Sequence, residues 1–162
     1  MSNYNKSRYY REPPYLLRAS KTFTGAANLG AVGVNELFTV TGTVLIERFL
    51  AYVSTTLSDT VDGALFNIET AAYPSAFFDG GAFDLDLAVT GTWLHGTGVG
   101  ADLAGNYGGL NADISWPVGL SANIIMTIST QAITGGVLEF YVLWRPLSAD
   151  GNLAIGAGMV AI

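Results

Sequence analysis

The chain has 162 residues, of which 12% are charged and 50% are hydrophobic, and it contains no cysteine. The absence of cysteine excludes a disulfide framework and thiolate chemistry, and no apolar run reaches the roughly 18–20 residues that a membrane-spanning helix needs. Ordinary soluble domains carry about 25% charged residues. The low charge therefore favours a surface that other subunits cover.

Residues 1–21 differ from the rest of the chain in charge. Five basic residues and one acid give this stretch +4, whereas two basic residues against twelve acids give the remainder −10. Pro13 and Pro14 favour an extended backbone, so the stretch predicts an extended N-terminal arm. Tyr and Arg are enriched in protein interfaces. The expected interface residues are therefore Arg8, Tyr9, Tyr10, Arg11, Tyr15 and Arg18.

Two other roles for the arm remain open. Its basic side chains and tyrosines would suit a nucleic acid, through phosphate contacts and base stacking, or the arm would be a solubilising tail. The acidic remainder and a sequence pI near 4.4 argue against a nucleic-acid partner. Leu16, Leu17 and the tyrosines are costly to leave in water. The acidic body of a neighbouring copy is the better complement.

The arm is followed by a Gly/Ala-rich connector at residues 22–36 and a predicted β-sandwich domain at residues 37–162. Residues 37–57 are rich in Val, Thr, Phe and Leu, which favour strands, and Gly42 inside them indicates a bulge or bend. Shorter strands are expected at residues 64–70 and 83–89, where apolar and polar residues alternate. The core-facing residues of the first stretch are expected to be Phe38, Val40, Val44, Ile46, Leu50 and Tyr52.

Two further alternating segments, residues 122–131 and 137–145, flank the turn signal Ile133-Thr134-Gly135-Gly136. They predict an antiparallel hairpin. A glycine-dense stretch at residues 90–111 predicts a long ordered loop. Many short strands, Gly-rich turns and hardly any helical pattern predict an all-β fold, an antiparallel and jelly-roll-like β-sandwich.

Residues that could carry chemistry are few. His95 is the single histidine, and no nucleophile-elbow pattern accompanies it, so a surface or interface role is expected rather than a hydrolase. Residues 96–100 read G-x-G-x-G without a following helix that could bind phosphate. Asp84 and Asp86, with Asp79 nearby, indicate a solvated strand face, with Ca²⁺ binding as the alternative. We expect no enzymatic activity, catalytic residue, cofactor or metal.

Three phrases carry a resemblance to a known family. They are LFTVTGTVLI at residues 37–46, WPVGLSANIIMTISTQAITGGVLEFYVLWRPLSADG at residues 116–151, and the Ala/Gly-rich close of the chain. Together they resemble small virion structural proteins of tailed bacteriophages, which have an early strand of the first pattern and a Gly-Gly hairpin near the C-terminus. The resemblance transfers no catalytic residues. It implies a component of a phage particle, assembled in the host cytoplasm.

Among such components we expect a capsid decoration (cement) protein whose arm docks on the major capsid protein or on neighbouring subunits. The expected assembly is a homo-trimer, without membrane or nucleic-acid contact. The alternative is a head-fibre, neck or tail component with a carbohydrate-binding β-sandwich. In that case Trp93, Tyr107 and Trp116, around the glycine-dense stretch, would form a platform for sugars.

Overall fold

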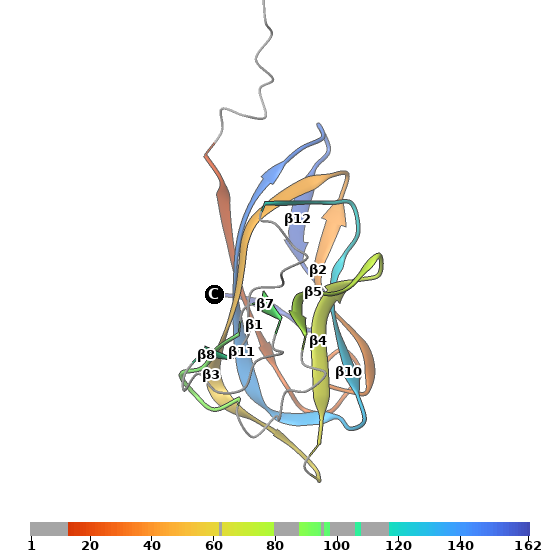
Figure 1. Ribbon diagram of the computed structural model, residues 1–162, viewed down its shortest axis with the longest axis vertical. Helices are drawn as coiled ribbons and strands as arrows, with labels where there is room; N and C mark the ends of the chain where they lie inside the picture. The colour runs from red at the N-terminus through yellow and green to blue at the C-terminus, as the bar shows by residue number, and fades with distance from the viewer. Residues whose placement is uncertain (1–12, 62, 80–87, 95, 98–105, 108–116) are drawn as a thin grey trace, which may run out of the picture.

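The structure is a computed structural model that describes residues 13–61, 63–79, 88–94, 96–97, 106–107 and 117–162. Over these residues the chain is all-β, with thirteen strands in two mainly antiparallel sheets and no helix. Figure 1 shows the two sheets side by side along the long axis of the molecule. The predicted antiparallel β-sandwich is therefore confirmed.

The larger sheet has the strand order β13-β1-β11-β3-β6-β8, with β9 beside β3. Its long central strands are β11 and β3, and short strands lie at both edges. The bounds are β1 (Tyr15–Thr22), β3 (Val44–Asp59), β6 (Trp93–Leu94), β8 (Asn106–Tyr107), β9 (Val118–Leu120), β11 (Ile133–Pro146) and β13 (Val160–Ala161).

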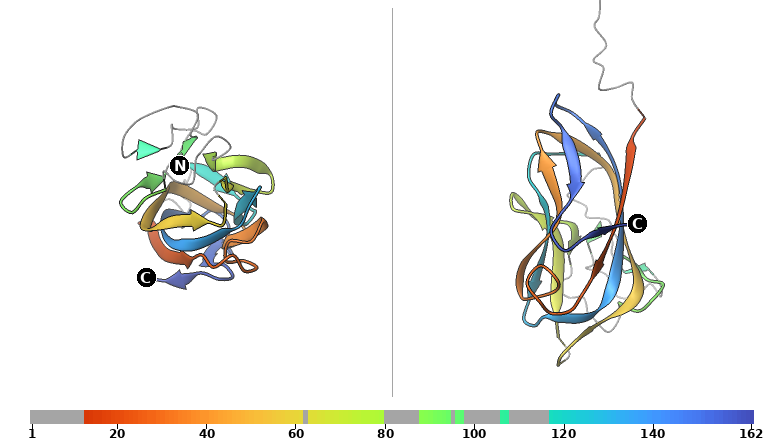
Figure 2. Two further views of the ribbon diagram at one scale, coloured as in Figure 1. Left: turned by 90° about the horizontal axis from the view of Figure 1, so that it is seen from below. Right: turned by 180° about the vertical axis from the view of Figure 1, so that it is seen from behind.

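The smaller sheet has the strand order β12-β2-β10-β4-β5-β7. The bounds are β2 (Gly33–Thr41), β4 (Leu65–Thr70), β5 (Tyr73–Asp79), β7 (Gly96–Thr97), β10 (Ile124–Ser129) and β12 (Asn152–Ile155). The end-on view in Figure 2 shows the two sheets curving around a shared interior.

The strand pairs are nested along the sequence. β1 pairs with β11, β2 with β10, β3 with β6 and β4 with β5, each time antiparallel. The partners β1, β11, β3 and β6 lie in the larger sheet, and β2, β10, β4 and β5 lie in the smaller one. Consecutive long strands such as β1 and β2, or β3 and β4, therefore contribute to opposite layers.

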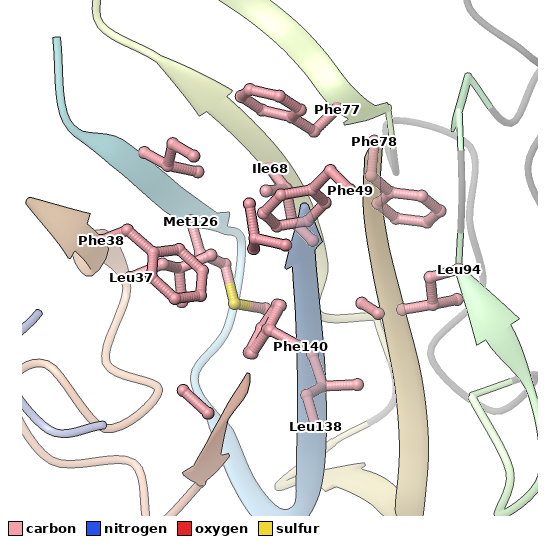
Figure 3. Close-up of a cluster of buried hydrophobic side chains, with 14 of the residues drawn as sticks. Leu37, Phe38, Phe49, Ile68, Phe77, Phe78, Leu94, Met126, Leu138 and Phe140 are labelled. Carbon is pink, nitrogen blue, oxygen red and sulfur yellow. The ribbon is translucent and has the colours of Figure 1, made fainter. Parts of the chain in front are cut away.

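The core lies between the inner faces of the two sheets. Leu138, Phe140 and Val142 of β11 and Ile124 and Met126 of β10 are buried, as their alternation predicts. Phe38 of β2 meets the rings of Phe49 and Phe140 edge to face, with centroids 6.1 and 5.9 Å apart (Figure 3). Both sheets thus contribute aromatic rings to one apolar cluster, whose burial is the main stabilising term.

The predicted hairpin between residues 122–131 and 137–145 is wrong. These segments form β10 and most of β11, which lie in opposite sheets. The Gly-Gly pair lies inside β11, where the register shifts, and Gly136 has φ +97°. A Cβ there would lie 2.4 Å from the carbonyl oxygen of Thr56. The glycines therefore allow β11 to bend against β3 and do not make a tight turn.

Gly42 is also a turn residue between two strands and not a bend within one. It has φ +60° and separates β2 in the smaller sheet from β3 in the larger one. The backbone N–H of Thr43 donates to Ser148 Oγ at 2.8 Å, which fixes the turn. The connector also ends earlier than predicted, because β2 begins at Gly33.

The predicted arm is partly a strand of the sandwich. Residues 15–22 form β1 and pair with β11 at every position, from Tyr15 opposite Trp144 to Thr22 opposite Val137. Apolar residues of this stretch, such as Ala19, reach the core and favour a strand over a free arm. The remaining predicted arm residues, Arg8, Tyr9, Tyr10 and Arg11, lie outside the described residues.

A β-bulge in β3 reverses the side-chain alternation that the sequence predicts. Arg48 lies opposite Leu143, but Ile46 lies opposite Trp144, so Glu47 is an extra residue. Before the bulge Phe38, Val44 and Ile46 are buried as predicted, and Val40 is partly buried. Beyond it Phe49, Ala51 and Val53 are buried, and the predicted core residues Leu50 and Tyr52 are on the outside.

The predicted strand at residues 83–89 is only described at its end. The alternation of Phe83, Leu85, Leu87 and Val89 with Asp84, Asp86 and Ala88 predicts Val89 on the buried side, but Ala88 is buried and Val89 is 48% exposed. Asp84 and Asp86 lie outside the described residues.

Candidate functional site on the outer face of the large sheet

The outer face of the larger sheet is assembled from five strands. Residues that lie opposite one another in neighbouring strands point to the same face, and Arg18, Tyr141 and Leu50 form one such row across β1, β11 and β3. Glu139, Tyr52 and Trp93 form another across β11, β3 and β6. We call this surface the large-sheet face; it comprises Leu16, Arg18, Ser20, Arg48, Leu50, Tyr52, Trp93, Glu139, Tyr141, Leu143, Val160 and Ile162.

On this face Trp93 contacts two other aromatic side chains, Tyr52 and Tyr141. The ring of Trp93 lies 4.8 Å from that of Tyr52 and 5.8 Å from that of Tyr141, measured between centroids. The interplanar angles are 45° and 46°, so the rings are tilted and not coplanar. Such cross-strand aromatic contacts hold each ring in place.

Tyr141 also joins the charged residues of the face. The guanidinium of Arg18 lies over its ring at 5.2 Å from the centroid, a cation–π contact. Its hydroxyl donates to the carboxylate of Glu139 at 2.7 Å. This hydrogen bond raises the pKa of Tyr141 because it favours the neutral phenol. A basic and an acidic side chain, Arg18 and Glu139, thus both contact Tyr141.

Large apolar side chains of the face are exposed. The exposed fractions are 60% for Leu16, 64% for Val160, 47% for Ile162 and 38% for Trp93. Val160 lies opposite Ser20 across the β1–β13 pair, and the N–H of Ile162 donates to the Arg18 carbonyl. The apolar surface therefore continues from the centre of the sheet to its edge, as is typical of an interaction surface.

Two of the residues that the sequence predicts at an interface, Tyr15 and Arg18, lie on opposite sides of β1. Arg18 lies on the large-sheet face, whereas Tyr15 stacks on the inward-facing Trp144 with centroids 5.2 Å apart. Tyr15 is still 47% exposed because it lies at the end of the strand. The two residues point to opposite sides of one strand.

The predicted sugar platform is not assembled by the described residues. Trp93 lies on the large-sheet face, but its described ring partners are Tyr52 and Tyr141. Tyr107 is described only as a backbone position of β8, opposite Leu94, and Trp116 lies outside the described residues. Alternation assigns Tyr52 to the core, so only knowledge of the bulge could have placed it beside Trp93.

A second polar cluster lies under the crossing from β12 to β13. Lys21 is fully buried, and its Nζ donates to the carbonyl of Glu36 at 3.1 Å and to that of Ala157 at 3.5 Å. The Glu36 carboxylate accepts from the Asn123 amide at 3.2 Å and from the Ala157 N–H at 3.3 Å. Burial lowers the pKa of Lys21 to about 8, and the charge of Glu36 acts in the opposite direction. The cluster ties the two sheets together at one edge.

The described residues do not bring the candidates for catalysis or metal binding together in a site. His95 lies outside the described residues, and Asp79 is described only as the last backbone position of β5. In the described ranges no three His, Cys, Asp or Glu side chains gather where they could hold a metal ion. Nor does that part of the chain contain a helix long and apolar enough to span a membrane. Comparison with protein-family models, curated proteins and solved structures found no match for the chain.

Proposed function

We propose that the chain is a non-enzymatic structural protein of a tailed-phage particle, and that it serves as a capsid decoration (cement) protein. The observation that carries the proposal is the large-sheet face, where Leu16, Trp93 and Val160 are exposed together. Surfaces of this kind are stable in water when a partner covers them. The sequence resemblance to phage virion proteins supplies the kind of partner.

We also propose that the sandwich is a jelly roll. Its support is the nesting of the antiparallel pairs β1–β11, β2–β10, β3–β6 and β4–β5, with successive strands alternating between the sheets. Jelly rolls form viral capsid domains, and they also form lectins and cupins. Because one fold hosts many functions, this analogy supports a particle component without specifying its role.

In this proposal the body associates with copies of itself, with a trimer as the expected assembly, and residues 1–12 are the docking arm. Arg8, Tyr9, Tyr10 and Arg11 would contact the major capsid protein or an acidic neighbouring subunit. Nucleic acid and membrane are not part of the assembly. Repetition over a particle raises the effective concentration, so each contact can be individually weak.

The arm is tested by deleting residues 1–12. A deletion of residues 1–21 would remove most of β1, which pairs with β11 along its whole length, and would unfold the body. We expect the shorter deletion to keep the thermal unfolding of the full chain but to lose attachment to particles, measured by mass spectrometry of purified virions. Full occupancy by the shortened chain would contradict the arm.

The particle assignment itself is tested by immunogold electron microscopy of virions that carry the gene. Gold on the heads supports a decoration protein, and gold on the neck, tail or fibres supports the alternative. Absence of the protein from purified virions would overturn both versions of the proposal.

One observation favours the alternative of a carbohydrate-binding fibre, neck or tail component. Trp93 is 38% exposed and lies beside Tyr52 and Tyr141, and aromatic rings are common sugar contacts. The tilt of about 45° between the rings makes a poor flat platform. Glycan-array binding that disappears in Trp93→Ala would establish this role, and loss of the signal with a chelator would add Ca²⁺ to it.

A further inference from the structure

We propose that the large-sheet face is the surface against which a second copy of this chain packs, sheet face to sheet face. The inference depends on the proposed function in one respect, that the body associates with itself, and it replaces the expected trimer by a pair related by a twofold axis. It adds which surface is used and which residues determine the pairing.

The first argument is the composition and rigidity of the face. Sheets pack face to face about 10 Å apart, with apolar side chains of the two facing sides in contact. The large-sheet face offers Leu16, Leu50, Leu143 and Val160 on neighbouring strands. Its aromatic rings are already held by contacts among themselves, so little side-chain freedom would be lost on association.

The second argument is the arrangement of charge, which identifies the occupant. Arg18 and Glu139 are held by the ring and the hydroxyl of the same residue, Tyr141. A partner surface of a single sign would attract one of them and repel the other. A second copy related by a twofold axis can present Glu139 where the first presents Arg18. Arg18 and Glu139 therefore complement each other, as an isologous interface requires, while the second basic side chain of the face, Arg48, lies in the row of Leu16 and Leu143.

The outer face of the smaller sheet does not share this property. We call it the small-sheet face; it comprises Val34, Glu36, Leu65, Asn67, Glu69, Ile125, Thr127 and Ser129. Among these described residues there are acids but no basic side chain and no aromatic ring. Packing of this face on itself would oppose like charges. It therefore supplies the matched control.

The experiment compares two charge insertions at equally exposed positions. Leu16 on β1 is 60% exposed, and Val34 on β2 is 63% exposed. Leu16→Glu would bury an unpaired carboxylate in the proposed interface, so we expect the dissociation constant to rise more than about tenfold. Val34→Glu is expected to leave it unchanged. Sedimentation velocity on the full-length chain, over a range of concentrations, measures both.

A second experiment uses charge reversal and does not depend on either variant being fully stable. Arg18→Glu and Glu139→Arg should each weaken self-association, because each opposes like charges across the twofold axis. When the two variants are mixed, one chain carries acids at both positions and the other carries bases at both. Opposite charges then meet at both contacts, and the mixed pair should form. Native mass spectrometry distinguishes the mixed pair from the two parents, and thermal unfolding of each parent establishes that it is folded.

The outcomes separate the inference from the proposed function. An even-numbered assembly that is lost in Leu16→Glu and restored in the charge-reversed mixture supports the inference. A trimer, or an assembly that is indifferent to Leu16→Glu, overturns the inference but leaves self-association intact. A wild-type chain that stays monomeric at all concentrations overturns the inference and the self-association that it depends on, while binding to particles would still be open to the deletion test.

Discussion

The large-sheet face and the small-sheet face differ in how their outward side chains are satisfied. On the small-sheet face Thr127 donates to the carboxylate of Glu69, so polar groups of neighbouring strands partner one another. On the large-sheet face the outward residues of the central strands include Tyr52, Trp93 and Tyr141, and apolar residues surround them. An antiparallel sheet normally leaves its outer face polar. The larger sheet therefore departs further from this pattern, because aromatic rings occupy the centre of its outer face.

The difference between the two faces depends on the phase of β3 beyond the bulge at Glu47, which an insertion tests directly. Inserting one alanine between Arg48 and Phe49 shifts the alternation of the rest of β3 by one residue, so Leu50 and Tyr52 would turn inward and Phe49, Ala51 and Val53 outward. Moving several core side chains at once should cost more than about 4 kcal/mol of unfolding free energy. Urea unfolding followed by tryptophan fluorescence measures the loss. An unchanged free energy of unfolding would mean that the core does not fix the phase of β3 beyond the bulge.

Glu47→Ala is the control for that insertion. It keeps the bulge and removes only the ion pair with Arg145, whose side chains are about one-quarter exposed. Partly exposed ion pairs contribute about 0–1 kcal/mol. We therefore expect a small change, well separated from that of the insertion.

The next largest effect on the free energy of unfolding is expected for Lys21, which links the two sheets at one edge. Lys21→Met removes the donor to the carbonyls of Glu36 and Ala157 and leaves the Glu36 carboxylate without its countercharge. Loss of these contacts should destabilise the fold by about 1–3 kcal/mol at neutral pH. Thermal unfolding measures the change, and a more stable variant would mean that desolvation of the lysine outweighs its contacts.

The same lysine gives a pH signature. Its pKa is about 8 in the folded protein against an ordinary value of 10.5, so between these pH values the unfolded chain binds the extra proton. The free energy of unfolding should therefore rise with pH between about 8 and 10.5. Below pH 8 this lysine should not contribute to the pH dependence, because it is protonated in both states. Lys21→Met removes this component. Equal slopes in the two proteins over that range would contradict the lowered pKa.

The smallest expected effects compare the two faces directly. Tyr141→Phe removes the hydrogen bond to Glu139, and Thr127→Val removes the one to Glu69. Each change should cost about 0.5–1.5 kcal/mol or less, because the groups are only partly buried. Only Tyr141→Phe should also weaken self-association, since it releases Glu139 from its fixed position. An equal effect of both changes on association would remove the distinction between the faces.

Several strands can be predicted from alternation alone. The buried positions Ile124, Met126 and Ile128 in β10, and Leu138, Phe140 and Val142 in β11, are where the period of two places them. Alternation cannot assign these strands to sheets, because a strand with one buried face looks the same in either layer. The predicted hairpin is wrong for that reason. A Gly-Gly pair is typical of a turn, but it also allows a bend within a strand.

The large-sheet face is the feature that the sequence predicts least well. The sequence predicts Arg18 at an interface and Trp93 at a binding surface, and both lie on the large-sheet face. It assigns their neighbours Tyr52 and Leu50 to the core, because one extra residue at Glu47 shifts the phase of everything that follows. No local pattern marks that residue, since the bulge is a property of the pairing with β11.

Residue type and local spacing are enough to establish the all-β class, the period-two strands and the uneven distribution of charge. Folding in three dimensions sets which strand pairs with which, where the register shifts and which faces are left outside. Those features depend on contacts between residues far apart in the chain, such as Ile46 with Trp144 or Tyr52 with Trp93. Apolar residues suit a core and a partner equally well, so only the fold distinguishes the two.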